Sequence, residues 1–297
     1  MNKAEIIRKE LRLIIRELGL LNHNCLNSEL TLMQAHILNY IKQNGTTPFN
    51  ELTLQLGTDK ASLSRTLTSL ESKKFIKVEK STTDKRIKLI SLLPLGIDTM
   101  KKGDIEANKF INEILNLGDS TINNNIAKSL EDFRILTLKN NLKKDDSRIK
   151  LEKLPTNYYD NAIKLATKVF NYEQNIPEKL IPINKNSKQN WWCARVGEDI
   201  IGIVASWFEN NKWHWGRFAV DIRLRGTGIG KKLALFSLKE IFNNNVDKLY
   251  IDARDITVIL LKQYGCEVLG EPVDFYGEPV TPLLMKKEDF INSIKIK

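Results

Sequence analysis

The stretch from Phe218 to Lys232, with the helix pattern that continues from it, constrains the fold more than any other part of the sequence. The apolar run Phe218-Ala219-Val220 has the pattern of the end of a buried strand, and KKLALFSLKEIF, from Lys231, has the pattern of an amphipathic helix. Between them lies RGTGIG, which begins at Arg225 and places three glycines within five residues. Glycine allows both a tight turn and a close approach of the backbone to a ligand.

A glycine turn that opens a helix leaves N–H groups unpaired, and the helix dipole adds partial positive charge there. Phosphate groups bind at such positions, and Arg225, Lys231 and Lys232 add formal charge. The P-loop pattern does not fit, because no Ser or Thr follows a correctly spaced Gly-Lys. The dinucleotide fingerprint does not fit either, because the glycines fall as G-x-G-x-G. Two alternatives remain, a pyrophosphate site and a turn without a ligand.

Arg225, Gly228 and Gly230 form an R-x-x-G-x-G pattern that starts five residues beyond Val220. This pattern resembles the acetyl-CoA motif of the GNAT acetyltransferases. The resemblance implies that acetyl-CoA binds as the acetyl donor. The cofactor-binding residues that it implies are Phe218, Ala219, Val220, Arg225, Gly226, Thr227, Gly228, Ile229, Gly230 and Lys231.

Length and composition bound the remaining possibilities. A chain of 297 residues suggests about two domains. We expect no membrane span, because no run of 18 apolar residues occurs, and no secretory signal, because the N-terminus lacks an apolar core segment. Three widely spaced cysteines favour a cytoplasmic protein without disulfides. No metal site is expected, since the histidines at 23, 36 and 214 are scattered.

Positive charge is concentrated in one part of the first half of the chain. The net charge is +10, and residues 60–88 alone hold nine basic and three acidic residues. Such a segment is typical of a protein that binds a polyanion such as DNA. If this segment had no further sequence pattern, the alternative to polyanion binding would be a basic surface that only contacts solvent.

This basic segment does carry a pattern. Residues 31–43, 51–56 and 60–73 read as helices joined by short glycine-containing turns, which indicates a helix-turn-helix. In the last of these helices Leu63, Leu67 and Leu70 form the side predicted to be buried. The polar and basic residues off that side are suited to phosphates and base edges in a major groove: Lys60, Ser62, Ser64, Arg65 and Thr68.

A strand pattern follows the helices. Residues 75–80 and 87–92 read as two strands, and the tip between them, 81–86, is polar and basic. Two strands directly after a recognition helix predict a winged helix. Arg86 is expected to enter a minor groove with Asp84 orienting its guanidinium, and Asp84, Lys85 and Arg86 are the DNA-binding candidates here.

The segments LTLMQAHILNYI, ELTLQLGTDKASLSRTLTSLESKKFI, DKR and SLLPLG occur in the order and spacing of MarR-type winged-helix regulators, which residues 1–142 resemble. The resemblance implies an operator in double-stranded DNA and a homodimer formed through this N-terminal domain. Helices are expected over 95–116, interrupted at Gly103, and over 119–141. Lys74 stands where this family usually has glycine, so we expect strain at the end of the recognition helix.

Residues 143–149 are polar and charged and are predicted to be a linker, and the second domain spans 150–297. Its predicted elements alternate in the order β-α-β-β-β-α-β-α-β, which is the order of the GNAT fold. The expected fold class is therefore two domains, a mainly α winged helix followed by an α/β GNAT acyl-CoA N-acyltransferase fold. The segment VFNYEQNIP and the Pro-rich segment 271–282 resemble a bacterial GNAT subfamily.

Candidate catalytic residues follow from this resemblance. An acetyl thioester is already activated, so the enzyme needs proximity and a base for an ammonium substrate. His214, on the strand before the glycine turn, is the first candidate for the base, and Glu173 is the second. GNAT enzymes often have a tyrosine acid where this chain has Leu261. Tyr264 is the nearby substitute, and water is the alternative proton source.

Two functions are therefore expected. The first is a bifunctional transcriptional regulator and acetyl-CoA-dependent N-acetyltransferase, which acts on an amine of a small molecule or on a protein lysine. The second is a DNA-binding regulator whose GNAT-like domain senses acetyl-CoA or another ligand and is catalytically weak. Leu261 favours the second, whereas the glycine turn fits both.

Overall fold

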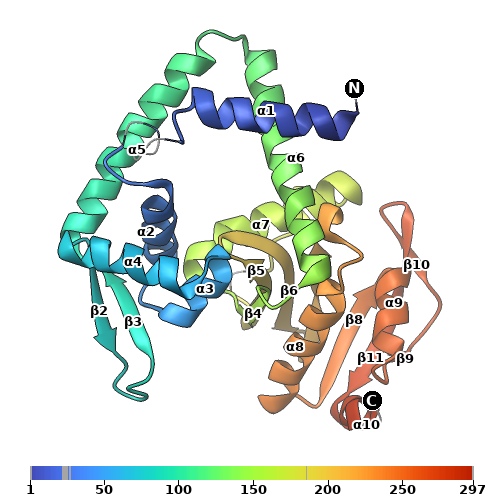
Figure 1. The fold of residues 1–297 in the computed structure, drawn as a ribbon. Helices are drawn as coiled ribbons and strands as arrows, with labels where there is room; N and C mark the ends of the chain where they lie inside the picture. Colours follow the sequence, from blue (N-terminus) through green and yellow to red (C-terminus); the bar gives the residue numbers. More distant parts are fainter. Residues whose placement is uncertain (1, 22–25, 27, 185, 296–297) are drawn as a thin grey trace. The chain divides into compact units, whose positions relative to one another are not determined.

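The computed structural model describes residues 2–21, 26, 28–184 and 186–295 (Figure 1). The chain separates into two compact units, Met1–Phe133 and Arg134–Lys297, and the division falls inside helix α6, Ser120–Lys144. Residues 143–149 hold the end of α6 and a turn that leads into strand β4, Lys150–Lys153. The expected domain boundaries at 142 and 150 stay a prediction.

The first unit is a helical domain with a small antiparallel sheet of the order β1-β3-β2. Asn2 and Thr31 begin two of its helices with capping boxes, in which the side chain three residues later bonds back to the cap. The elements before α6 are α1 Lys3–Glu17, α2 Leu32–Asn44, β1 Thr47–Pro48, α3 Phe49–Leu56, α4 Lys60–Ser72, β2 Ile76–Lys80, β3 Lys88–Leu92 and α5 Pro94–Leu115.

One apolar core joins α2, α4 and the small sheet. Leu63, Leu67 and Leu70 of α4 are at most 4% exposed, which confirms the predicted buried side of this helix. They belong to one cluster with Ile37 of α2 and Ile90 of β3. Burial of this side leaves the opposite, polar face of α4 in solvent.

Two expectations about backbone conformation have different outcomes. Strain after α4 is confirmed, because Lys74 adopts a φ of 58°, in the left-handed region that side chains disfavour. The predicted interruption at Gly103 is wrong, because α5 continues through it. A Cβ at Gly103 would lie 3.4 Å from the Cβ of Ser28, so this glycine fits a close approach of residue 28 rather than a break.

The second unit is an α/β domain built on an eight-stranded sheet. The strand order is β10-β11-β8-β7-β6-β5-β4, with β9 paired to β11, and β7 and β8 form the parallel pair among otherwise antiparallel neighbours. Its further strands are β5 Gln189–Val196, β6 Asp199–Glu209, β7 Lys212–Val220, β8 Lys248–Ala253, β9 Glu267–Val268, β10 Val273–Phe275 and β11 Glu278–Lys286.

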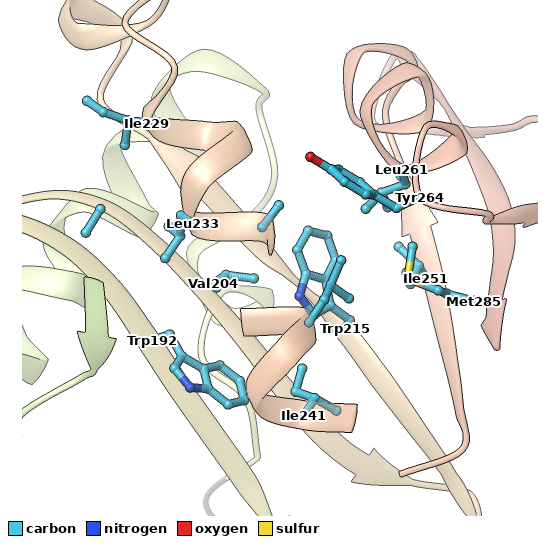
Figure 2. Packing of buried hydrophobic residues seen from close by; sticks show 14 of the residues in the cluster. Trp192, Val204, Trp215, Ile229, Leu233, Ile241, Ile251, Leu261, Tyr264 and Met285 are labelled. Carbon is cyan, nitrogen blue, oxygen red and sulfur yellow. The ribbon is translucent and has the colours of Figure 1, made fainter. Parts of the chain in front are cut away.

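Helices cover both faces of this sheet. Helix α7, Tyr159–Thr167, continues as a π-helical turn over Lys168–Glu173 and packs with Trp191, Ile203 and Ala219 on one face. The other face carries a larger cluster, part of which Figure 2 shows around Trp215. The helices that supply that cluster are α8 Ile229–Asn243, α9 Asp255–Lys262, α10 Lys287–Lys295 and the last part of α6.

The predicted strands and helices of both units are present, with ends shifted by a few residues. Strands β1, β9 and β10 and helix α10 were not predicted from the sequence. In the described part of the chain, no helix combines the length and the hydropathy needed to cross a membrane.

Candidate functional site

The glycine turn joins strand β7 to helix α8, as the sequence predicts. Gly226 and Gly228 have φ values of 82° and 81°, and a Cβ at either position would meet no atom within 4 Å. Gly228 is the N-cap of α8, and it supplies no side chain to bond the N–H groups of the first turn. This turn therefore offers unpaired donors at the positive end of a helix dipole, with open space beside them.

Strand β7 separates from β8 just before this turn. In the described part of the chain, the two strands share the single ladder pair His214↔Tyr250. On the other side, β7 has one extra residue relative to β6, because Ala219 pairs with Ile203 whereas Gly216 pairs with Ala205. The bulge lies at Arg217 and Phe218, and Arg217 has a φ of 52°.

A cavity of about 750 Å³ opens where β7 and β8 separate. Nine of the ten residues predicted to bind the cofactor line it. The exception is Thr227, whose hydroxyl donates a hydrogen bond to the Leu224 carbonyl at 2.7 Å. The nine are Phe218, Ala219, Val220, Arg225, Gly226, Gly228, Ile229, Gly230 and Lys231. The open space beside the glycines and the free first turn of α8 fit a pyrophosphate group.

Two of the three cations expected near the turn already have acidic partners. The Arg225 guanidinium donates from Nη2 to Glu173 Oε2 at 2.7 Å and from Nε to the Val220 carbonyl at 3.2 Å. Lys232 is paired with Asp146. The third cation, Lys231, lines the cavity. The turn therefore carries less uncompensated charge than its sequence suggests.

His214 lies on β7 and lines the same cavity. Its ring stacks on Trp207, with ring centroids 5.4 Å apart and planes inclined by 16°. Its Nε2 atom is buried and has no hydrogen-bond partner among the described residues. The residue thus lines the cavity while its unpartnered nitrogen is covered by neighbouring atoms, and its role as the base stays a prediction.

Glu173 is placed beside the glycine turn through its ion pair with Arg225. It is not one of the cavity-lining residues, although its neighbour Gln174 is. Its second oxygen, Oε1, is buried without a hydrogen-bond partner in the described part of the chain. The carboxylate of Glu173 thus pairs with Arg225 beside the glycine turn, and its role as a base stays a prediction.

Tyr264 lies in the apolar cluster next to Leu261, and both are at most 2% exposed. Figure 2 shows its hydroxyl directed away from Ile251 and Met285. Tyr264 is not among the residues that line the cavity. Burial raises the pKa of Tyr264, so the phenol keeps its proton at neutral pH. A protonated phenol is the form that can act as a general acid, and the role of Tyr264 as that acid stays a prediction.

Arg217 also lines the cavity, and it was not among the predicted site residues. Its Nε and Nη2 donate to the carbonyls of Ile181 and Leu180, each at 2.8 Å, and its Cζ lies 5.3 Å from the centroid of the Trp207 ring. The sequence feature that could have indicated a site residue is the position of this arginine, between Gly216 and the apolar end of a predicted strand. The outward or inward direction of that arginine depends on the bulge, which the sequence does not specify.

Cysteine chemistry is not favoured in this domain. Burial raises the pKa of Cys193 and of Cys266 to about 12, so both stay as thiols near neutral pH and are poor nucleophiles. Among the described residues, no group of three or more His, Cys, Asp or Glu side chains could hold a metal ion. Cys25 and His23 lie outside those residues.

The predicted DNA-contacting residues of α4 share its solvent face. Asp59 caps the helix by accepting a hydrogen bond from the Ser62 N–H at 2.8 Å, and Arg65 donates to the Ser62 hydroxyl at 3.2 Å. The hydroxyl of Thr68 bonds back to the Ser64 carbonyl. Lys60, Ser64, Arg65 and Thr68 are exposed and Ser62 is partly buried, so the helix presents short polar groups and two cations.

The strands β2 and β3 form the predicted hairpin, and its tip holds Asp84, Lys85 and Arg86. Both carboxylate oxygens of Asp84 accept hydrogen bonds from Arg86, at 3.0 Å and 2.9 Å. These hydrogen bonds lower the pKa of Asp84, so the pair stays charged at neutral pH. The Arg86 side chain is 90% exposed, which agrees with an arginine that is oriented but available.

The first unit also exposes apolar stripes at helical spacing. Helix α1 has no buried residue, and one of its faces presents five isoleucine and leucine side chains that are 38–43% exposed. A second stripe runs along the first part of α6. The exposed residues are Ile6, Ile7, Leu11, Ile14 and Ile15 in α1, and Ile122, Ile126, Leu130 and Phe133 in α6. Exposed stripes of this length are typical of association surfaces.

Family models match a part of each unit. Residues 30–88 match the MarR family model, and residues 158–261 match the acetyltransferase (GNAT) family model. One chain thus carries a MarR domain and a GNAT domain, and the expected fusion and the two-domain fold class are confirmed. No curated protein is a significant match to the chain.

Similar solved structures each cover less than half of this chain. Escherichia coli ElaA is 18% identical, with a TM-score of 0.43, over 46% of this chain and 99% of its own. An acyl-CoA N-acyltransferase from Pseudomonas aeruginosa is 17% identical, with a TM-score of 0.40, over 46% and 97%. Bordetella bronchiseptica BpsR, whose DNA binding is regulated by 6-hydroxynicotinic acid, is 17% identical, with a TM-score of 0.37, over 44% and 98%.

Proposed function

Since a MarR domain and a GNAT domain occur in this one chain, we propose that it is a bifunctional transcriptional regulator and acetyl-CoA-dependent N-acetyltransferase. The observation that carries the enzymatic half is that the glycine turn and His214 open onto the same cavity. The turn would hold the pyrophosphate, and the separated edge of β7, Phe218–Val220, would bond the pantetheine arm. The acetyl group would then lie between β7 and β8.

Acetyl-CoA supplies an activated acetyl thioester, and the chain's own residues handle position and protons. His214 accepts a proton from the ammonium group of the acceptor through its unpartnered Nε2. The N–C bond forms as the C–S bond breaks. The nitrogen loses two protons overall, and one proton is returned to the sulfur. Tyr264 is the proposed donor of that proton, with water as the alternative.

The DNA-binding half of the proposal depends on α4 and on the hairpin tip between β2 and β3. The polar face of α4 would enter a major groove, and Arg86 would enter the adjacent minor groove. A homodimer formed through the apolar stripes of α1 and α6 would present two such surfaces to a palindromic operator. Two matching half-sites one helical turn apart are the expected target.

A second candidate function is a regulator whose GNAT domain senses acetyl-CoA without efficient turnover. The specific observation in its favour is that Leu261 is fully buried where many GNAT enzymes carry the acid, while Tyr264 is not part of the cavity lining. Both candidates require acetyl-CoA to bind at the glycine turn, so binding and turnover have to be measured separately.

The experiment follows acetyl-CoA turnover as free thiol against small amines and basic peptides, with binding measured by tryptophan fluorescence. Gly228→Ala, at a φ of 81°, is expected to weaken acetyl-CoA binding about ten-fold or more, because the added methyl enters the open turn. Gly197→Ala is the matched control, since Gly197 also has a positive φ and open space but lies in the β5–β6 hairpin turn.

Turnover that is lost in His214→Gln would support the enzyme. Saturable binding without turnover on any acceptor would support the sensor. Absence of acetyl-CoA binding by the wild-type protein would overturn both candidates.

A further inference from the structure

Three arginines line the cavity, and they differ in their partners. Arg225 is paired with Glu173 at 2.7 Å, and Arg254 is paired with Glu278 at 3.5 Å. Arg217 forms no ion pair with any carboxylate in the described part of the chain. Arg217 is therefore the one of these three arginines that has no carboxylate partner among the described residues.

The guanidinium of Arg217 is fixed in place rather than mobile. Two carbonyls accept from its Nε and Nη2, and its plane is held over the Trp207 ring. These contacts leave its Nη1 donors for another acceptor. A guanidinium held in this way is preorganised for a planar anion, because little side-chain entropy is lost when the anion binds.

The surroundings of Arg217 make an anion favourable. Burial lowers the pKa of Arg217, and the charge of Glu209 opposes that shift. The Oε2 atom of Glu209 accepts a hydrogen bond from Trp207 Nε1 at 3.3 Å, and among the described residues no ion pair forms between Glu209 and Arg217. A cation that has lost part of its hydration without gaining a carboxylate is destabilising, and a bound anion would remove this penalty. The backbone of Arg217 is also in the left-handed region, at a φ of 52°, which costs free energy. Strain of this kind is common where a side chain must be aimed at a site.

His214 and Arg217 both contact the same indole ring. The centroid of the His214 ring lies 5.4 Å from that of Trp207, and the Cζ of Arg217 lies 5.3 Å from it. Trp207 thus places a buried proton acceptor and an unpaired cation in one cavity. A small molecule that carries both an ammonium and a carboxylate would offer one group to each of these residues.

We propose that the acetyl acceptor is a small amine that bears a carboxylate, of the α-amino acid type, and that Arg217 is its specificity-determining residue. This inference rests on the proposed acetyltransferase function of the same cavity. The carboxylate accepts from Arg217, the amine meets His214 Nε2, and the side chain lies against the apolar lining formed by Leu180, Ile181 and Trp207. The product is the corresponding N-acetyl amino acid.

The test compares each amino acid with its uncharged amide. Binding of L-leucine, L-leucinamide, L-phenylalanine and L-phenylalaninamide to the full-length protein is measured by calorimetry with CoA present. We expect each acid to bind at least ten-fold more tightly than its amide, because a site built around a charged hydrogen bond rejects the analogue that lacks it. In Arg217→Gln this preference is expected to disappear, and in Arg217→Lys to return only in part.

Arg254→Gln is the matched control, because it removes a cavity-lining cation that already has a carboxylate partner, and it should keep the preference. Glutamine at 217 meets the same backbone strain as arginine but loses hydrogen bonds to the carbonyls of Ile181 and Leu180, so the melting temperature should fall by a few degrees. Arg254→Gln likewise loses hydrogen bonds to two carbonyls, so it controls for this loss of stability.

The proposal is overturned if the wild-type protein binds acids and amides equally, if it binds neither, or if Arg217→Gln keeps the preference. Turnover separates this proposal from the proposed function. Acid preference without turnover would contradict the enzyme alone, whereas turnover of basic peptides or amides without preference for acids would contradict this inference alone.

Discussion

Glu173 accepts a hydrogen bond from Arg225 at 2.7 Å and so neutralises the cation closest to the glycine turn. In Glu173→Gln that cation becomes available to phosphate, and we expect acetyl-CoA to bind about three-fold to ten-fold more tightly. Turnover at saturation should fall little, whereas His214→Gln should lower it by about 10²-fold or more.

Glu178→Gln is a suitable control, since it removes an exposed neighbouring acid for which no ion pair is seen among the described residues. The reverse pattern, with turnover lost in Glu173→Gln and kept in His214→Gln, would assign the base to Glu173.

Tyr264→Phe tests the proposed acid. If the phenol protonates the departing sulfur, the substitution should lower turnover about ten-fold or more while acetyl-CoA binding stays unchanged. Phenylalanine fits the same apolar surroundings, so the melting temperature should change by only a few degrees. Unchanged turnover would leave water as the proton source and would remove Tyr264 from the mechanism.

Arg65→Ala and Arg86→Ala test the DNA-binding surface. Each should weaken binding to DNA from the protein's own promoter region. If the lost contact is to a phosphate, the slope of log affinity against log salt should decrease by about one. Lys109→Ala removes an exposed cation of α5 outside this surface and should have little effect. Full affinity in both arginine variants would reject the assignment of α4 and the hairpin tip.

Leu11→Glu tests the proposed dimer. Leu11 lies at the centre of the exposed stripe of α1, and a carboxylate there would be costly to bury between two subunits. We expect the variant to become monomeric at concentrations where the wild type is dimeric, as measured by sedimentation equilibrium. Leu54→Glu is the control, because Leu54 of α3 is equally exposed but lies outside the stripes. A variant that stays dimeric would exclude this face.

Lys74→Gly tests the strain after α4. Glycine adopts a φ of 58° without the penalty that a side chain meets, so the variant should be stabilised by about 0.5–1 kcal/mol in urea unfolding. Lys73→Gly provides the contrast, since Lys73 has a φ of −79° and gains nothing from glycine. Equal effects of the two substitutions would mean that charge, not backbone conformation, sets the stability here.

Much of the fold could be predicted because local patterns and tertiary burial agree. The leucines of α4 repeat at helical spacing, and the glycine turn stands between a clear strand and a clear helix. The elements that were missed depend on partners far away in the sequence. Strand β1 has two residues and exists through pairing with β3, and α10 is held by Phe290, which packs against Phe242 and Tyr264.

The candidate site was predicted less completely than the fold. The spacing of the glycines was enough to locate the turn, because the N–H groups that would bind phosphate belong to consecutive residues. The partners of charged side chains were not predictable, because Glu173 and Arg225 are 52 residues apart and meet only in the folded domain. The direction of Arg217 depends on a bulge, and nothing in the residues around it distinguishes a bulged strand from a regular one.

The separation of β7 from β8 has a consequence for how this domain unfolds. Because one ladder pair joins these strands in the described part of the chain, few backbone hydrogen bonds cross the seam, that is, the boundary between β7 and β8. Amide protons along the seam should exchange with solvent by local opening, well before global unfolding. A ligand bound between β7 and β8 would supply partners for backbone groups that do not pair across this boundary. A higher concentration of such a ligand would then raise the free energy of unfolding of the domain, and with it the resistance of the protein to proteolysis.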